Sequence, residues 1–267
     1  MKYWIIAIFG LLLACNQPVK NKVPDTLTKE EMPAPVQQLF KKIAANPDST
    51  GLRLQLVNAL DSLGAFGQAL GQMDFLIKKD SLNYGLWYRK ALLQESTKDT
   101  SGALRSYRYA IRIYPSPDAQ LAAANLLAER KDSTALLICR QVASLRMGRE
   151  YTAHCHFITG IYFARTGNKQ KALDAFNNSI ANDLNYTEAY MEKGFLYYDD
   201  KKYKEALQVY RTLVTVKNTY ADGYYWLAKT EEALNNKAEA INNYQKSLTL
   251  DPALQEAAAA LQRLGAK

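Results

Sequence analysis

The chain has 267 residues, of which 48% are hydrophobic and 22% are charged. This balance provides enough apolar side chain for a folded core and excludes a chain that is disordered throughout. The formal net charge of +8 suggests a nucleic-acid-binding protein, but the export signal at the start of the chain argues against that class.

The first residues have the pattern of an export signal. Lys2 precedes an apolar run over residues 3–13, which is too short for a stable membrane span. The run ends in the sequence LLAC at residues 12–15, which resembles the lipobox of bacterial lipoproteins. The resemblance implies a signal peptide over residues 1–14 and lipidation of Cys15, whose acyl chains would anchor the protein in a membrane.

Residues 15–35 are predicted to be a flexible tether. After the cysteine they are rich in Pro, Lys, Asn, Thr and Glu and contain almost no large apolar side chain. A flexible coil of about 20 residues spans roughly 25 Å, which sets the distance from the membrane to the folded part. Asn16 favours the outer membrane and the periplasm, because an aspartate after the lipidated cysteine is the inner-membrane signal in some bacteria. Display on the cell surface stays open.

Small residues recur at a fixed interval along the rest of the chain. The interval is 34 residues, and it separates the members of two series: Gly160, Gly194 and Ala228, and Ala172, Ala206 and Ala240. A glycine in a helix interior costs about 1 kcal/mol relative to alanine, so Gly194 indicates the close approach of another element. We expect Ala206 to lie opposite Gly194, where two antiparallel helices cross.

This period resembles the tetratricopeptide repeat, a helix-turn-helix unit of about 34 residues. The unit that matches the family pattern best carries Trp87, Ala91, Ala103, Tyr107, Ala110 and Pro115. The resemblance implies an all-α fold: a right-handed α-solenoid of about six units with a C-terminal capping helix, all within a domain over residues 36–267. The units are predicted at residues 50–83, 84–117, 118–152, 153–186, 187–220 and 221–254.

The third unit, 118–152, is degenerate. Asn125 stands where a small residue is expected, and Ala135 takes over the crossing position of the second helix after a shortened turn. That helix is predicted at about residues 134–146, followed by an irregular link at 147–149. At the two ends of the array, helices over residues 36–45 and 253–264 would cover the terminal faces.

The resemblance also implies a binding groove on the concave face, which the first helices of successive units line. The residues predicted to line it are mainly apolar and aromatic: Tyr88, Leu92, Phe157, Ile161, Met191, Phe195, Tyr198 and Tyr225. Such a stripe is either core or a groove for an extended or amphipathic segment of a partner protein. Stacking on an envelope glycan or peptidoglycan is the less favoured alternative, because only Asn58 and Lys229 offer hydrogen bonds at the two main groove-facing positions of each unit.

Neither catalysis nor a metal or cofactor site is predicted. The two histidines, His154 and His156, are two residues apart on a helix and so point to different sides. No phosphate-binding loop, nucleophile elbow or catalytic carboxylate pair is present in the sequence, so we expect a protein that is not an enzyme. Cys139 and Cys155 flank the irregular link and form either a disulfide or two buried free thiols, of which the second is favoured.

Two basic clusters remain: Arg105, Arg108 and Arg112 on one helix face, and Lys201, Lys202 and Lys204 at a turn. They are interpreted as solvated surface, with anionic lipid or an acidic partner as the alternative. The sequence thus predicts a membrane-anchored adaptor or scaffold that binds a protein or peptide in the bacterial cell envelope, and no nucleic acid.

Overall fold

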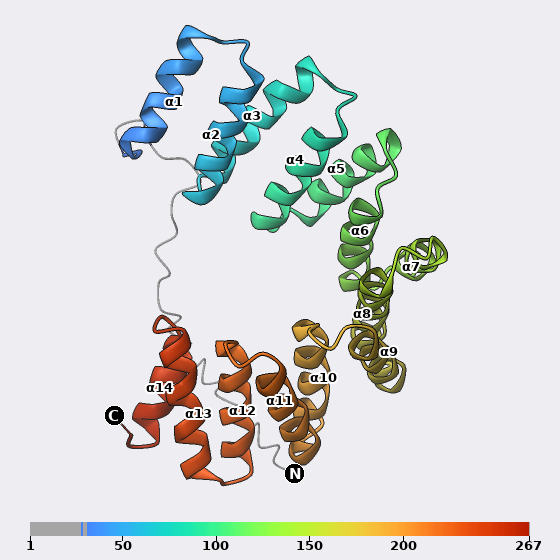
Figure 1. Cartoon of the computed structure of the whole chain (residues 1–267), viewed down its shortest axis with the longest axis vertical. Helices are drawn as coiled ribbons and strands as arrows, with labels where there is room; N and C mark the ends of the chain where they lie inside the picture. Colours follow the sequence, from blue (N-terminus) through green and yellow to red (C-terminus); the bar gives the residue numbers. More distant parts are fainter. Residues whose placement is uncertain (1–27, 29–30, 267) are drawn as a thin grey trace, which may run out of the picture. The chain divides into compact units, whose positions relative to one another are not determined.

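The computed structural model describes residue 28 and residues 31–266, so the predicted signal peptide, Cys15 and most of the tether lie outside the described residues. The described residues form 14 α-helices and no strand (Figure 1), which confirms the all-α fold class. The helices are α1 (Ala34–Ala45), α2 (Thr50–Ser62), α3 (Phe66–Lys79), α4 (Tyr84–Ser96), α5 (Thr100–Ile113), α6 (Pro117–Glu129), α7 (Thr134–Ser144), α8 (Arg149–Arg165), α9 (Lys169–Asn182), α10 (Thr187–Asp199), α11 (Tyr203–Val216), α12 (Ala221–Ala233), α13 (Lys237–Leu250) and α14 (Gln255–Arg263).

The described helices belong to two compact units, with α1 to α3 in the first and α4 to α14 in the second. In the first unit, α2 packs against both α1 and α3. Leu56, Leu60 and Met73 are fully buried and form the centre of this small core. The guanidinium carbon of Arg53 lies 3.5 Å from the ring centroid of Phe75, a cation–π contact that holds α2 to α3.

In the second unit, consecutive helices pack as antiparallel pairs: α4 with α5, α6 with α7, α8 with α9, α10 with α11, and α12 with α13. Each pair also packs against the next, and α13 packs against α14. We call α4, α6, α8, α10 and α12 the first helices of these pairs, and α5, α7, α9, α11 and α13 the second helices. The helix-turn-helix organisation that the period predicts is therefore present throughout this unit.

The turns inside the pairs share one backbone device. A residue in the left-handed region ends the first helix at Lys98, Lys131, Gly167, Lys201 and Asn235. At Lys98 the next amide, that of Asp99, donates to the Gln94 carbonyl at 2.9 Å, as in a Schellman cap. The side chain of Asp99 then accepts from the Gly102 amide and starts α5. The cap and the new helix start are only one residue apart, so the chain changes direction within a tight turn and the second helix packs back on the first.

The helix crossings differ from the prediction in one respect. A Cβ atom built on Gly194 would lie 2.4 Å from the ring of Tyr210, and one built on Gly160 would lie 2.4 Å from the ring of Phe176. The partner of Gly194 is therefore Tyr210 rather than Ala206. Helical side chains lean toward the N-terminus, so a ring one turn after Ala206 covers the place beside it. The small residue on the first helix makes room for a ring.

The third pair departs from the others. Its second helix, α7, has 11 residues, and Ala135 is fully buried at its start. The link to α8 covers residues 145–148, where Gly148 has φ of 118°, a conformation that favours glycine. Arg149, which was predicted to lie in the link, is the first residue of α8. This helix begins one turn before the predicted unit start at residue 153.

That additional turn of α8 ties several helices together. The hydroxyl of Tyr151 donates to Asp118 of α6 at 3.0 Å, and the Arg149 guanidinium donates to the Ala181 carbonyl at the end of α9 at 2.7 Å. Within the described residues, α8 contacts α6, α7, α9 and α10. The irregular pair is therefore held by its neighbour.

Cys139 of α7 and Cys155 of α8 are 3% and 5% exposed, and both are free thiols. The hydrogen bond between the two side chains, together with burial, raises the pKa of the Cys139 thiol. Of the two alternatives, the structure has the buried free thiols.

The terminal helices are close to their predicted positions. Pro33 caps α1, which begins at Ala34, so the last two residues of the predicted tether are helical. Met32 is 3% exposed, which makes it part of the fold as well. At the other end, α14 lies within the predicted capping segment 253–264. None of the described helices is long and apolar enough to cross a bilayer.

Candidate functional site: an aromatic groove on the first helices

Three pockets lie on the second unit, and each is lined by two or more of its first helices. The first is about 300 Å³ and is lined by α4, α6 and α8, with Tyr88, Leu121 and His154 among its residues. The second is about 400 Å³ and includes Phe157 of α8, Phe195 of α10 and Trp226 of α12.

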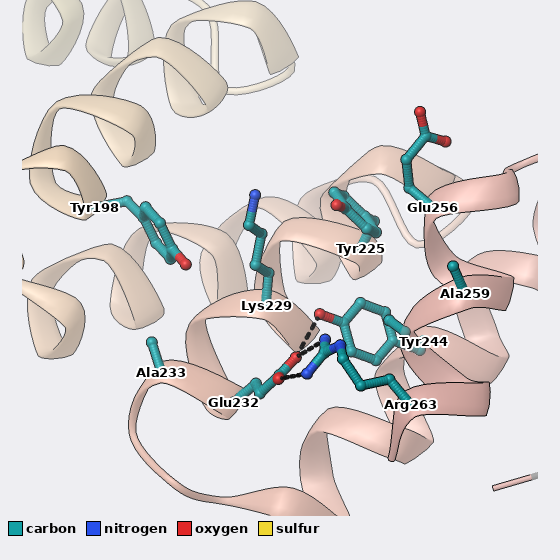
Figure 2. A pocket seen from close by; sticks show the side chains of 10 residues that line it. Tyr198, Tyr225, Lys229, Glu232, Ala233, Tyr244, Glu256, Ala259 and Arg263 are labelled. Atoms are coloured by element: carbon teal, nitrogen blue, oxygen red, sulfur yellow. Dashed lines mark hydrogen bonds and ion pairs between the residues drawn. The ribbon is translucent and has the colours of Figure 1, made fainter. Parts of the chain in front are cut away.

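The third pocket is about 440 Å³ and is formed by α10, α12, α13 and α14. Tyr198, Tyr225 and Tyr244 contribute the rings (Figure 2). We call the three pockets together the first-helix groove.

Ring contacts connect the three pockets into one surface. His154 of the first pocket has its ring centroid 6.5 Å from that of Phe157 in the second. Trp226 of the second pocket lies 5.5 Å from Tyr198 and 5.7 Å from Tyr225 of the third, both in edge-to-face geometry. Such aromatic pairs favour offset or edge-to-face geometry, so neighbouring rings in the groove floor stabilise each other's orientation.

The third pocket also contains ionised groups. Glu232 accepts from the Tyr244 hydroxyl at 3.1 Å and from the Arg263 guanidinium at 2.9 Å, so α12, α13 and α14 meet at this carboxylate. Arg263 holds the pKa of Glu232 below its ordinary value. Figure 2 shows the Lys229 side chain rising between Tyr198 and Tyr225. Its amino nitrogen is 4.3 Å from the Trp226 ring centroid.

Family models of the tetratricopeptide repeat match residues 54–116, 159–222 and 221–254, which together make up more than half of the chain. The chain belongs to the tetratricopeptide repeat family. The matches leave out residues 117–158, the region of the degenerate pair α6 and α7 and of the first part of α8.

Solved structures of tetratricopeptide repeat proteins have a similar fold. A repeat protein from Parabacteroides merdae ATCC 43184 is 17% identical, with a TM-score of 0.68 over 86% of this chain and 90% of its own. PilW, a widely conserved type IV pilus biogenesis factor, is 18% identical, with a TM-score of 0.62 over 79% of this chain and 97% of its own. The APC/C hetero-tetramer Cut9-Hcn1 is 14% identical, with a TM-score of 0.59 over 86% of this chain and 46% of the matched chain. No curated protein matches the chain.

Most of the residues predicted for the groove of this repeat array lie in it. Tyr88 lines the first pocket, Phe157, Met191 and Phe195 line the second, and Tyr198 and Tyr225 line the third. Except for Met191, which is 7% exposed, these side chains are half-buried.

Two predicted groove residues are placed elsewhere. Ile161 is 1% exposed and belongs to the core around α8, so its assignment to the groove is wrong. The reason is that α8 is covered by more neighbours than the other first helices, which brings this side chain inside. Leu92 of α4 is 37% exposed and lines none of the three pockets.

The polar part of the groove was not predicted from the sequence. Glu232 and Arg263 are 31 residues apart in the chain, and only the return of α14 onto α12 brings them together. Trp226 was missed as well, although its position one residue after the predicted Tyr225 was a usable signal.

The histidines and the basic cluster on α5 are the remaining candidate groups of the sequence analysis. His154 and His156 are both half-buried, and burial lowers the pKa of each. Among the described residues, no group of three or more His, Cys, Asp or Glu side chains has an arrangement that could hold a metal ion. Arg105, Arg108 and Arg112 are exposed on one face of α5.

Proposed function

We propose that this tetratricopeptide repeat protein is a lipid-anchored adaptor that binds a protein or peptide partner in the bacterial cell envelope, without catalysis. The partner would lie in the first-helix groove. Cys15 would carry the lipid, and the outer membrane facing the periplasm would be the location, with surface display as an alternative.

The groove is the observation that carries this proposal. Phe157, Phe195, Tyr198 and Tyr225 are half-buried, so part of each ring stays in contact with solvent while its neighbours fix its orientation. Rigid, partly exposed aromatic side chains in a pocket are the usual hot spots of protein interfaces. The membrane anchor is supported by the sequence of residues 2–15 alone.

Crosslinking in intact cells, followed by mass spectrometry, tests the partner class. We expect reproducible recovery of one protein with the wild-type chain and a loss of more than about tenfold with Phe195→Ala/Tyr225→Ala. Tyr109→Ala/Tyr114→Ala is the matched control, because these rings are 48% and 61% exposed and line none of the three pockets. Circular dichroism of both variants would show whether folding, rather than binding, is lost.

Glycan binding is the alternative that the same experiment separates. Recovery of glycan fragments without a reproducible protein partner would contradict the adaptor function.

The anchor is tested on its own by Cys15→Ser, which should move the protein from the membrane fraction to the soluble fraction. A variant that stays in the membrane fraction would contradict lipidation at this residue.

A further inference from the structure

The first helices of the second unit carry a row of carboxylates along the groove. From α6 onward, each first helix has an acidic residue in its first turn, and so does α14: Asp118, Glu150, Glu188, Asp222 and Glu256. All five line the groove, two in the first pocket, two in the second and one in the third. The aromatic floor therefore has an acidic edge.

The helix dipole alone does not account for this row. An acidic side chain in a first turn stabilises any helix by about 0.3 to 1 kcal/mol. The second helices would gain as much, yet α5, α7 and α9 have no acidic residue there, and only α11 and α13 do, with Glu205 and Glu239.

These carboxylates also lack cationic partners within the part of the chain that the structure describes. No Lys, Arg or His nitrogen of that part is within 4.0 Å of the carboxylates of Asp118, Glu150, Glu188 and Asp222, all of which are exposed. By contrast, Glu192, which also lines the second pocket, is paired with Arg165 at 3.1 Å. The full chain has a net charge of +8, so this acidic edge is a local feature and not a consequence of composition.

We propose that the segment of the partner protein that binds in the first-helix groove is basic, with lysine or arginine side chains on the carboxylate edge and apolar stems over the rings. This inference rests on the proposed adaptor function and adds the charge of the ligand to it. Lys229 shows that the rings of the groove can accept a basic side chain, because its ammonium group lies over the face of Trp226. A cation from the partner would find the same rings beside unpaired carboxylates.

Three fluorescent peptide pools of equal length test the charge. The pools share randomised apolar and aromatic positions and differ only in the other positions, which are Lys and Arg, Ser and Asn, or Asp and Glu. We expect the full chain, purified in mild detergent, to bind the basic pool at least about tenfold more tightly than the neutral pool, and less tightly as salt is added. The acidic pool should bind weakest.

Two double variants locate the effect. Glu188→Gln/Asp222→Asn should weaken binding of the basic pool by at least about tenfold, because both carboxylates line the second pocket. Glu205→Gln/Glu239→Gln is the matched control: it makes the same change in net charge and the same change at two helix starts, but on α11 and α13. We expect this control to bind like the wild type.

The outcomes separate this inference from the proposed function. Equal binding of all pools, lost in Phe195→Ala/Tyr225→Ala, would overturn the basic ligand and leave the adaptor function intact. Binding that does not depend on these rings would overturn both. Equal weakening by the two charge variants would overturn the inference as well. Tighter binding by Lys20→Gln/Lys22→Gln would show that the chain's own N-terminal segment occupies the groove, not a separate partner.

Discussion

The pairs α10–α11 and α6–α7 solve the same packing problem in different ways. In α10–α11, a glycine on the first helix faces the fully buried ring of Tyr210 on the second. In α6–α7, Asn125 holds the position of the glycine, and Cys139 holds the position of the ring, one turn after Ala135. The second pair therefore has a larger side chain where the first has none, and a smaller one where the first has a ring.

The difference shows that a repeat can lose its size pattern if a neighbour fills the space. In the irregular pair, Leu121 and Ala128 of α6 and Cys139 of α7 share one core cluster with Ile158 and Ile161 of α8. Apolar side chains of α8 thus occupy core space in the irregular pair. In the regular pair a ring on the second helix fills the corresponding space. A regular pair depends on its own crossing, whereas the irregular pair depends on the next helix.

The largest expected effect comes from breaking the regular crossing. Gly194→Leu would place a branched side chain where even a Cβ atom comes within 2.4 Å of the fully buried ring of Tyr210. We expect the free energy of unfolding to fall by about 1 to 3 kcal/mol. Chemical denaturation followed by circular dichroism measures this.

Gly71→Leu is the control for the same substitution, since a Cβ atom at Gly71 of α3 meets nothing within 4 Å. It should leave the free energy of unfolding unchanged or raise it by up to about 1 kcal/mol, because leucine is a better helix former than glycine. Equal losses in the two variants would mean that the leucine acts through a general effect such as solubility and not through the crossing.

Much of the fold could be predicted because the repeat encodes it locally. The interval between Gly160 and Gly194 fixes the period, and a fixed period of this length leaves few architectures. The exact partner at the crossing could not be predicted, because Ala206 and Tyr210 lie on one face of α11 and the interval does not say which of them reaches across. The start of α8 at Arg149 was also missed, since its first turn is fixed by contacts with α6 and α9.

The groove was predictable where it depends on repeat position, as at Phe157 and Tyr225. It was not predictable where tertiary packing changes the exposure, as at Ile161, or where distant segments meet, as at Glu232 and Arg263. The pattern of one unit gives the face of a helix. It does not tell how many neighbours cover that face.

Removing the ring hydroxyls of the second helices should change the stability by a smaller amount. The direction of the change should differ between Tyr107 and Tyr210. The Tyr107 hydroxyl donates to Glu95, and burial together with this carboxylate raises the pKa of Tyr107, so the group stays a donor. Tyr210 is in the corresponding place, but its buried hydroxyl has no partner among the described residues. Tyr107→Phe should therefore cost about 1 to 2 kcal/mol, while Tyr210→Phe should be neutral or stabilising. Thermal denaturation of both variants measures this difference. If Tyr210→Phe lost as much stability as Tyr107→Phe, the Tyr210 hydroxyl would have a hydrogen-bond partner, contrary to our interpretation.

A substitution at the crossing position of the irregular pair should raise the stability, whereas Gly194→Leu in the regular pair lowers it. The side-chain oxygen of Asn125 is buried and has no hydrogen-bond partner within the described residues. Asn125→Ala removes this unsatisfied group and introduces a better helix former, so we expect a gain of up to about 1 kcal/mol in the free energy of unfolding. Asn125→Asp keeps the size and should destabilise. If the alanine variant lost more than about 1 kcal/mol, the amide would be filling a space that α8 leaves open.

The smallest effect concerns pH and the two histidines of α8. His154 of α8 holds the repeat position that Glu188 holds in α10, and burial lowers its pKa although Glu188 and Asp118 oppose this shift. A lowered pKa means that the unfolded chain binds the proton more readily, so the contribution to stability is complete above the ordinary value of about 6.5 and is lost as the pH falls below it.

His154 and His156 are the only histidines of the chain, and the pKa of His156 is lowered in the same way. The melting temperature of the wild type should therefore fall between about pH 7.5 and about pH 5, a range in which most carboxylates stay ionised. His154→Gln/His156→Gln should remove this slope, and a variant that kept it would place the titrating groups elsewhere.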